Sequence, residues 1–210
     1  NKMNIFELFP TPVYKFSLLN HKKYKDKIIK TLLEKYENNE QTSIPWTGHC
    51  NSWQIDLREL NLDMRDVYGE IMEGFKKYLD YLEVKADKSF SMIDSWFNVH
   101  THEMYQEEHG HMPAFISGTY YIQFDKDKDN SLYFLSNNKE FIYSAWSMDV
   151  PISRKNLDNK IQLDVKEGDV LLFPSTLHHN VPKSKVKHDN LRITNSFNII
   201  AFNPTMNKKP

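Results

Sequence analysis

The chain is 210 residues long, which is enough for a single domain whose core needs no disulfide to hold it together. Hydrophobic residues make up 40% of it and charged residues 26%, a composition that excludes a wholly disordered chain. The formal net charge of −1 excludes a general electrostatic affinity for nucleic acid or for anionic lipid.

Cysteine content and hydropathy predict where the protein works. The single cysteine is Cys50, so no internal disulfide can form and a reducing compartment is expected. No apolar run reaches the roughly 18 residues that a membrane span needs, and the N-terminus shows no signal-peptide pattern. We therefore expect a cytoplasmic location and no membrane partner.

The first part of the chain predicts one strand and two helices. Aromatic residues and prolines punctuate residues 5–16, a pattern typical of an edge strand. Apolar residues recur at three- and four-residue intervals over 22–37 and again over 62–82, which predicts two amphipathic helices. The segment 38–52 between them is long enough to form a lid.

Beyond residue 88 the sequence changes to short aromatic and β-branched runs separated by Gly, Asn, Asp and Pro. Such runs without helical patterns between them predict an antiparallel sandwich or barrel. We expect strands at 90–99, 115–124, 131–135, 161–165, 170–173 and 191–202. The predicted fold is α+β and mainly β: a single domain, 1–210, in which an N-terminal strand and helices (about 1–87) accompany a β-barrel core (about 88–203).

Seven of the nine histidines lie in two short windows, residues 100–111 and 178–188. Histidine is the commonest metal ligand and titrates near neutral pH, so this clustering indicates chemistry. In an extended segment His109 and His111 point to the same face, where both imidazoles can reach one ion. Taken alone, such a pair is also a common surface feature.

The second window follows the predicted strand at 170–173. Because His178 and His179 are adjacent, we expect only one of them to face a site that includes the first pair. Three histidines from these windows would form a facial metal site with open positions for small ligands. The remaining members, His100, His102 and His188, are expected in turns or at the surface.

The last predicted strand carries polar residues on one face. Period-two alternation separates Arg192, Thr194, Ser196 and Asn198 from Ile193, Phe197 and Ile199. The polar row indicates either a polar cavity or the wet face of an edge strand. The planar guanidinium of Arg192 suits bidentate capture of a carboxylate, and the Thr194 hydroxyl can add a bond to the same anion.

Six motifs follow one another along the chain: Phe9–Tyr14, Trp96–Asn98, His109–Pro113, Ile116–Ile122, Leu172–Val181 and Leu191–Asn198. Together they resemble the 2-oxoglutarate/Fe(II)-dependent oxygenases of marine bacteria and tailed phages. The resemblance covers nearly the whole chain, and the order of the motifs is more specific than any one of them. For a phage-encoded chain, the expected compartment is the host cytoplasm.

This resemblance implies a double-stranded β-helix, a jelly-roll or cupin-like barrel. It implies a dioxygenase, a hydroxylase, that uses Fe(II), 2-oxoglutarate and O2 and couples oxidative decarboxylation of 2-oxoglutarate to substrate oxidation. Carried over residue by residue, His109 is the first metal ligand and His179 the distal one. Arg192 with Thr194 resembles the pair that binds the far carboxylate of 2-oxoglutarate, and the further candidates for the co-substrate site are Asn98 and Tyr121.

One position departs from the family pattern, because most of these enzymes carry aspartate where this chain has His111. Three neutral histidines leave the full charge on Fe(II), whereas a carboxylate would offset one unit. On a strand Glu108 points away from His109, and Glu107 shares its face but lies upstream. We therefore expect His111 to be the third ligand.

Two other functions fit parts of the pattern. A cupin-type metalloenzyme could work from three histidines without 2-oxoglutarate, which would leave Arg192 without its assigned partner. A non-catalytic β-barrel binding module would keep its histidines in solvated loops. The substrate, a small molecule or a protein side chain, is not identified by any motif, and the aromatic edge strand at 5–16 makes a homodimer an expectation.

Overall fold

The computed structural model describes residues 9–38, 52–84, 88–136, 143–144, 147–149 and 159–203. The start of the predicted strand at 5–16 and residues 39–51 of the predicted lid lie outside the described residues. Of the helices in the described ranges, none combines the length and the apolar character needed to cross a membrane.

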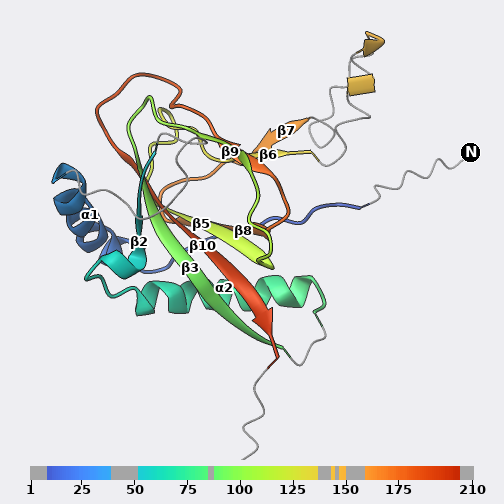
Figure 1. Ribbon diagram of the computed structural model, residues 1–210, viewed down its shortest axis with the longest axis horizontal. Coiled ribbons are helices and arrows are strands. Elements are labelled where there is room, and N and C mark those ends of the chain that lie inside the picture. The colour runs from blue at the N-terminus through green and yellow to red at the C-terminus, as the bar shows by residue number, and fades with distance from the viewer. Residues whose placement is uncertain are drawn as a thin grey trace, which may run out of the picture.

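Both predicted helices are confirmed, as α1 (His21–Glu37) and α2 (Arg65–Tyr81) (Figure 1). A short 3-10 helix, η1, covers Leu57–Glu59. The strands of the described chain are β1 (Tyr14–Ser17), β2 (Trp53–Asp56), β3 (Ser89–His100), β4 (Gln106–His109), β5 (Ile116–Gln123), β6 (Tyr133–Leu135), β7 (Lys160–Gln162), β8 (Asp169–Pro174), β9 (His179–Val181) and β10 (Arg192–Phe202).

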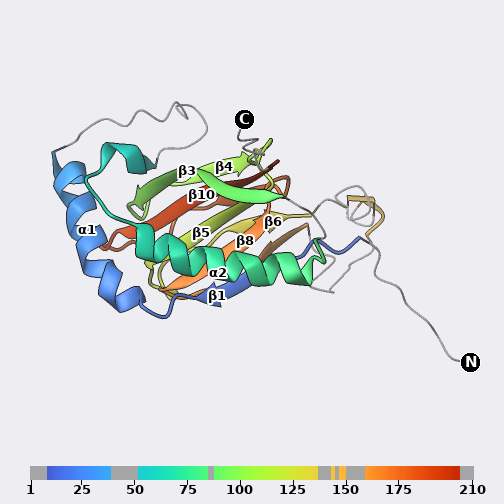
Figure 2. The ribbon, with the colours of Figure 1, turned by 90° about the horizontal axis from the view of Figure 1, so that it is seen from below.

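The strands form two antiparallel sheets. The large sheet has the order β1-β8-β5-β10-β3-β2, and the small sheet has the order β4-β9-β6-β7. Helix α2 lies across one face of the large sheet, with α1 beside it (Figure 2). The small sheet lies on the opposite side, so the large sheet is the middle layer of the molecule.

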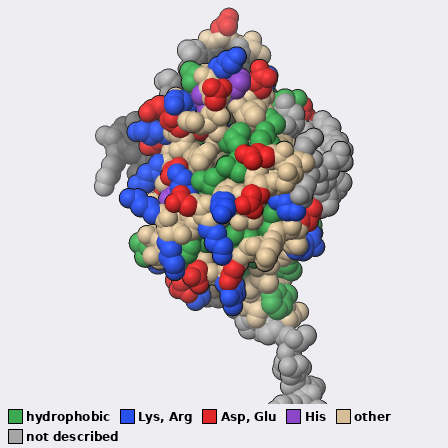
Figure 3. Space-filling view, turned by 90° about the vertical axis from the view of Figure 1, so that its left-hand side faces the viewer, with side chains coloured by type: hydrophobic (Ala, Val, Ile, Leu, Met, Phe, Trp, Pro, Cys, Tyr) green, Lys and Arg blue, Asp and Glu red, His purple; other side chains and the backbone are tan. Residues whose placement is uncertain are grey.

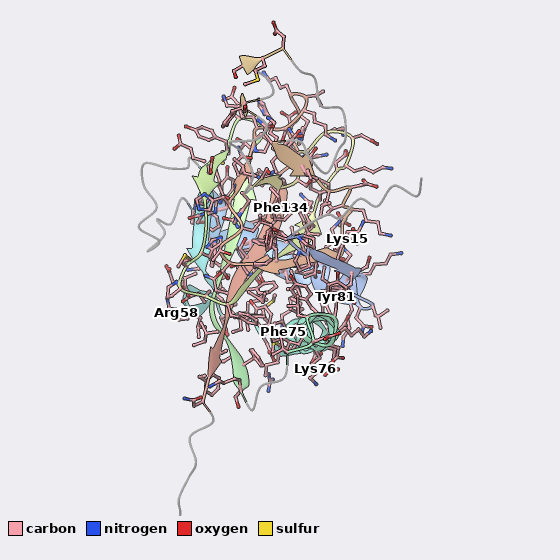
Figure 4. The ribbon with its side chains drawn as sticks, turned by 90° about the vertical axis from the view of Figure 1, so that its right-hand side faces the viewer. Lys15, Arg58, Phe75, Lys76, Tyr81 and Phe134 are labelled. Carbon is pink, nitrogen blue, oxygen red and sulfur yellow. The ribbon has the colours of Figure 1, made fainter. Side chains whose placement is uncertain are left out.

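Two apolar clusters flank this middle layer. The first joins the helices to the sheet and includes Phe75 of α2 with Phe197 of β10. The second lies between the sheets and includes Phe134 of β6 with Phe173 of β8, whose ring centroids are 5.0 Å apart. Figure 4 shows Phe75 beside α2 and Phe134 apart from it, toward the small sheet. The alternation predicted for the last strand is thus explained: its apolar residues face the helices, and its polar residues face the interior between the two sheets.

Three strands were not predicted, and each is only three or four residues long. They are β2, β4 and β9, which are too short to establish a period-two pattern of their own. The positions of β1 and β2 change the expected role of the first 87 residues. Both β1 and β2 are edge strands of the large sheet, so the N-terminal part contributes two strands to the β-structure as well as its helices.

Two glycines of α2 provide a paired test of the packing between α2 and β1. A Cβ at Gly74 would overlap the ring of Phe16, whereas a Cβ at Gly69 would meet nothing within 4 Å. We expect Gly74→Ala to lower the free energy of unfolding by about 1–3 kcal/mol through overpacking. Gly69→Ala should raise it by up to about 1 kcal/mol, because alanine favours the helix.

Both substitutions gain the same helix propensity, so the difference between them in urea or thermal denaturation isolates the packing effect. Equal stabilities for the two variants would contradict the contact with Phe16.

The surface carries both signs of charge. Figure 3 shows Lys and Arg side chains interspersed with Asp and Glu over one face of the molecule. Strand β1 occupies one edge of the large sheet, where the homodimer is expected, and that oligomeric state stays a prediction.

Candidate active site

Three histidines, two from the end of β4 and just beyond it and one from β9, meet at the edge of the small sheet. His109 is the last residue of β4 and His179 the first of β9, and these two residues are register partners. His111 lies beyond the end of β4, where its backbone N–H donates to the Ser175 carbonyl at 2.8 Å. One ligand atom from each histidine lies within 4.8 Å of the other two.

The imidazoles of His109 and His111 lie close together, with ring centroids 5.0 Å apart. Strand β4 ends at His109, and Gly110 and His111 continue without regular secondary structure to a turn at Met112 and Pro113. A Cβ at Gly110 would be 3.2 Å from the Ser175 carbonyl oxygen, so this glycine lets the segment lie close to the β8–β9 connection.

Hydrogen bonds set the tautomers of two imidazoles. The Nδ1–H of His109 donates to the Glu107 carbonyl at 2.6 Å, and that of His179 donates to the Leu177 carbonyl at 3.0 Å. Each ring must therefore bind a metal through Nε2. The Nε2 atoms of His111 and His179 are 3.3 Å apart, which is close enough for one ion to contact both.

Burial keeps all three imidazoles neutral. It lowers the pKa of His109, lowers that of His111 to about 4, and lowers that of His179 well below the usual range. The neighbouring imidazoles act in the same direction, since each protonated ring would repel the next. Neutral imidazole is the form that binds a metal, and a set of imidazoles suits Fe, Zn, Cu or Ni.

Neither acidic neighbour joins this cluster. Glu108 accepts a hydrogen bond from Nδ1 of His178 at 3.0 Å, and Glu107 contributes its backbone carbonyl to His109. The adjacent histidines thus separate: His179 is 3% exposed and faces the cluster, whereas His178 lies at the surface with Glu108. Among the described residues, the cluster of possible metal ligands contains histidines alone.

A cavity of about 350 Å³ opens beside the three histidines. Its other walls come mainly from β2, β3 and β10 and carry several polar side chains among apolar ones. They include Gln54, Asp56, Asp94, Trp96, Ser196 and Asn198. Sequence patterns identify the polar face of β10 but miss the β2 residues, because the four-residue β2 was not predicted as a strand.

Asn98 lies deeper in the structure than this cavity and links its walls. Its Oδ1 accepts hydrogen bonds from Nε2 of Gln54 at 2.7 Å and from Nε2 of Gln106 at 2.9 Å. Its Nδ2 donates to the hydroxyls of Thr194 at 3.4 Å and Ser196 at 3.1 Å. The cavity lining includes Ser196 but not Thr194 or Asn98, so these two lie one step behind the wall.

Tyr121 and Arg192 lie behind the same wall. Thr194 pairs in register with Asn98 on one side and with Tyr121 on the other, which places three of the four predicted co-substrate residues in one row across three strands. The Tyr121 hydroxyl accepts from the Leu132 N–H at 3.3 Å, and burial raises its pKa to about 12, so it is neutral. Arg192 is 5% exposed at the start of β10.

Sequence comparison assigns the family. The model of the family described as "Putative 2OG-Fe(II) oxygenase" matches residues 94–198, half of the chain, including all three clustered histidines and Arg192. The chain belongs to this oxygenase family. No protein with a curated description matches the chain in sequence.

Solved structures show that the oxygenase has the predicted double-stranded β-helix. A prolyl-4-hydroxylase from Pseudomonas putida has a TM-score of 0.61 at 9% identity, over 90% of this chain and 92% of that one. The viral collagen prolyl hydroxylase of Paramecium Bursaria Chlorella virus-1, in its 2-oxoglutarate complex, has a TM-score of 0.54 at 13% identity, over 89% and 94%. HygX from Streptomyces hygroscopicus, with nickel and 2-oxoglutarate bound, has a TM-score of 0.54 at 12% identity, over 93% and 84%.

The donor set of the oxygenase fits a divalent metal, because three neutral imidazoles, one buried and two half-buried, converge beside a cavity. The chemistry that bound Fe(II) supplies in this family is substrate oxidation coupled to the decarboxylation of 2-oxoglutarate. The oxygenase is therefore an Fe(II)- and 2-oxoglutarate-dependent enzyme that uses O2.

Proposed function

We propose that His109, His111 and His179 hold Fe(II) and that Arg192 with Thr194 binds the far carboxylate of 2-oxoglutarate. The observation that carries this proposal is the convergence of three neutral imidazoles, one buried and two half-buried, beside a cavity backed by the polar face of β10. The enzyme would then hydroxylate a substrate that enters this cavity.

Each group of residues has a separate task in this proposal. The backbone carbonyls of Glu107 and Leu177 hold two of the imidazoles in the tautomer that a metal needs. The apolar cluster around Phe173, whose ring centroid lies 5.0 Å from that of His179, keeps water from one side of the site. Cavity residues of β3 and β10 then orient the substrate.

The row behind the cavity wall would position the co-substrate. Asn98 holds Thr194 through a hydrogen bond, and Tyr121 lies on the other side of Thr194 as a neutral hydroxyl. Neutral neighbours leave the charge of Arg192 available to a carboxylate. Family membership favours this function over a 2-oxoglutarate-independent three-histidine enzyme and over a binding module without catalysis.

An anaerobic visible spectrum tests the proposal. Protein loaded with Fe(II) should develop a metal-to-ligand charge-transfer band when 2-oxoglutarate is added, because the keto acid chelates the iron. Glutarate, which lacks the keto group, is the matched control and should give no band. Bound iron without a band on adding 2-oxoglutarate would contradict the proposed co-substrate site.

A further inference from the structure

Arg192 is a buried cation whose described partners are all neutral. One terminal nitrogen donates to the Asn130 carbonyl at 2.6 Å, and the other donates to Nδ1 of His100. No described carboxylate forms an ion pair with it, and burial lowers its pKa to about 10, so it remains charged at neutral pH. A buried cation with only neutral hydrogen-bond partners would be stabilised by an anion that contacts it, and a bound carboxylate could supply one.

The acid that acts on Arg192 electrostatically is engaged elsewhere. Burial lowers the pKa of Arg192, and the electrostatic effects of Tyr121 and of Asp129 raise it and partly oppose burial. One oxygen of Asp129 accepts from Ser184 at 3.0 Å and contacts Nε2 of His188 at 3.1 Å, and the other accepts from the Asp125 N–H at 2.9 Å. Asp129 is thus fixed by its own partners and forms no ion pair with the guanidinium.

His100 is buried beside Arg192, contrary to the expected position in a turn or at the surface. It is 2% exposed at the end of β3, where it is the register partner of Arg192 on β10. A guanidinium can only donate hydrogen bonds, so Nδ1 of His100 must accept and the ring proton must be on Nε2. Burial and the charge of Arg192 both lower the pKa of His100, which keeps the ring neutral.

This tautomer is unfavourable in free energy, and packing alone gives no reason for it. Nε2 of His100 is buried and has no hydrogen-bond partner among the described residues. Leaving a buried donor unsatisfied is unfavourable, and an apolar side chain of similar size would avoid the penalty. The arrangement instead gives Arg192 a neutral acceptor for the terminal nitrogen that does not donate to the Asn130 carbonyl.

We propose that His100 is a positioning residue for the 2-oxoglutarate site, holding the guanidinium of Arg192 in place without neutralising it. The guanidinium of Arg192 has five N–H groups. Two of them donate to His100 and Asn130, and the other three have no described partner and are left for a carboxylate. An acidic residue at position 100 would hold Arg192 equally well but would cancel the charge that attracts the co-substrate. This inference rests on the proposed function, because it assumes that Arg192 binds 2-oxoglutarate.

Three variants at one position separate these roles. His100→Gln keeps a neutral acceptor, His100→Leu removes the acceptor, and His100→Asp supplies a charged one. The measurement is anaerobic titration of Fe(II)-loaded protein with 2-oxoglutarate, followed by the charge-transfer band, with Fe(II) affinity and thermal midpoint recorded for each variant. In turnover assays of succinate formation, the effect should fall on the KM for 2-oxoglutarate more than on kcat.

We expect the dissociation constant for 2-oxoglutarate to stay within about threefold of wild type in His100→Gln and to rise about 10- to 100-fold in His100→Leu. His100→Asp should bind still more weakly, with Fe(II) affinity unchanged in all three. Wild-type affinity in His100→Leu, or equal affinities in His100→Gln and His100→Asp, would overturn the positioning role.

The same titration distinguishes this failure from failure of the proposed function. If the wild-type protein gives no band, the proposed function is contradicted, and so is the role assigned to His100. If wild type binds 2-oxoglutarate and Arg192→Met does not, but all His100 variants bind as wild type does, only the inference about His100 is wrong.

Discussion

Replacing His179 with alanine is expected to abolish stoichiometric Fe(II) binding and, with it, succinate formation. His179 is the most buried of the three clustered histidines, and its Nε2 lies 3.3 Å from Nε2 of His111. Loss of a partner outside the ligand set already costs roughly 10–100-fold in metal affinity, so loss of a ligand should cost more than about 100-fold. Anaerobic Fe(II) titration and iron content after gel filtration measure this directly.

The neighbouring residue provides the control. His178 is adjacent in sequence but lies at the surface, where its Nδ1 contacts Glu108. His178→Ala should therefore bind Fe(II) within about threefold of wild type, because it removes an exposed contact that contributes little. Comparable iron binding by the two alanine variants would show that the metal lies elsewhere.

Arg192→Met is expected to abolish measurable 2-oxoglutarate binding while leaving the metal site intact. Removing one partner of a buried, hydrogen-bonded charge pair costs about 2–5 kcal/mol, which corresponds to about 30-fold to several thousand-fold in affinity. Fe(II) titration should be unchanged, since Arg192 is not among the cavity-lining residues beside the histidines. The charge-transfer titration with 2-oxoglutarate measures the loss.

Stability distinguishes a binding role for Arg192 from a structural one. Its buried charge has no described carboxylate partner, so methionine of similar length should leave the thermal midpoint of the ligand-free protein at or above that of wild type. Arg65→Met is the matched control, because Arg65 is exposed on α2 and pairs with Asp63. It should bind 2-oxoglutarate as wild type does. A strongly destabilised Arg192→Met that still binds 2-oxoglutarate would refute the assignment.

The clustering of histidines in sequence predicted which residues meet in the structure but not how they meet. His109 and His179 are 70 residues apart, and they face each other because β4 and β9 pair in that register. Strands of three or four residues have too little periodicity to be recognised from sequence. The choice between His178 and His179 follows from the same pairing, because β9 begins at His179, whereas His178 precedes the strand and lies at the surface.

Local sequence pattern determined the helices and those strands that are long enough for the hydrophobic period to repeat several times. Spacing along the chain predicts the two helices, the long strands β3, β5 and β10, and the polar face that begins at Arg192. The ordered motifs carried the family resemblance. Tertiary structure alone decided the edge position of β2, the depth of Asn98 behind the cavity wall, and the burial of His100 against Arg192. These depend on contacts between residues 44 to 98 positions apart, and the free energy of such contacts comes from burial and hydrogen bonding that no short window of sequence contains.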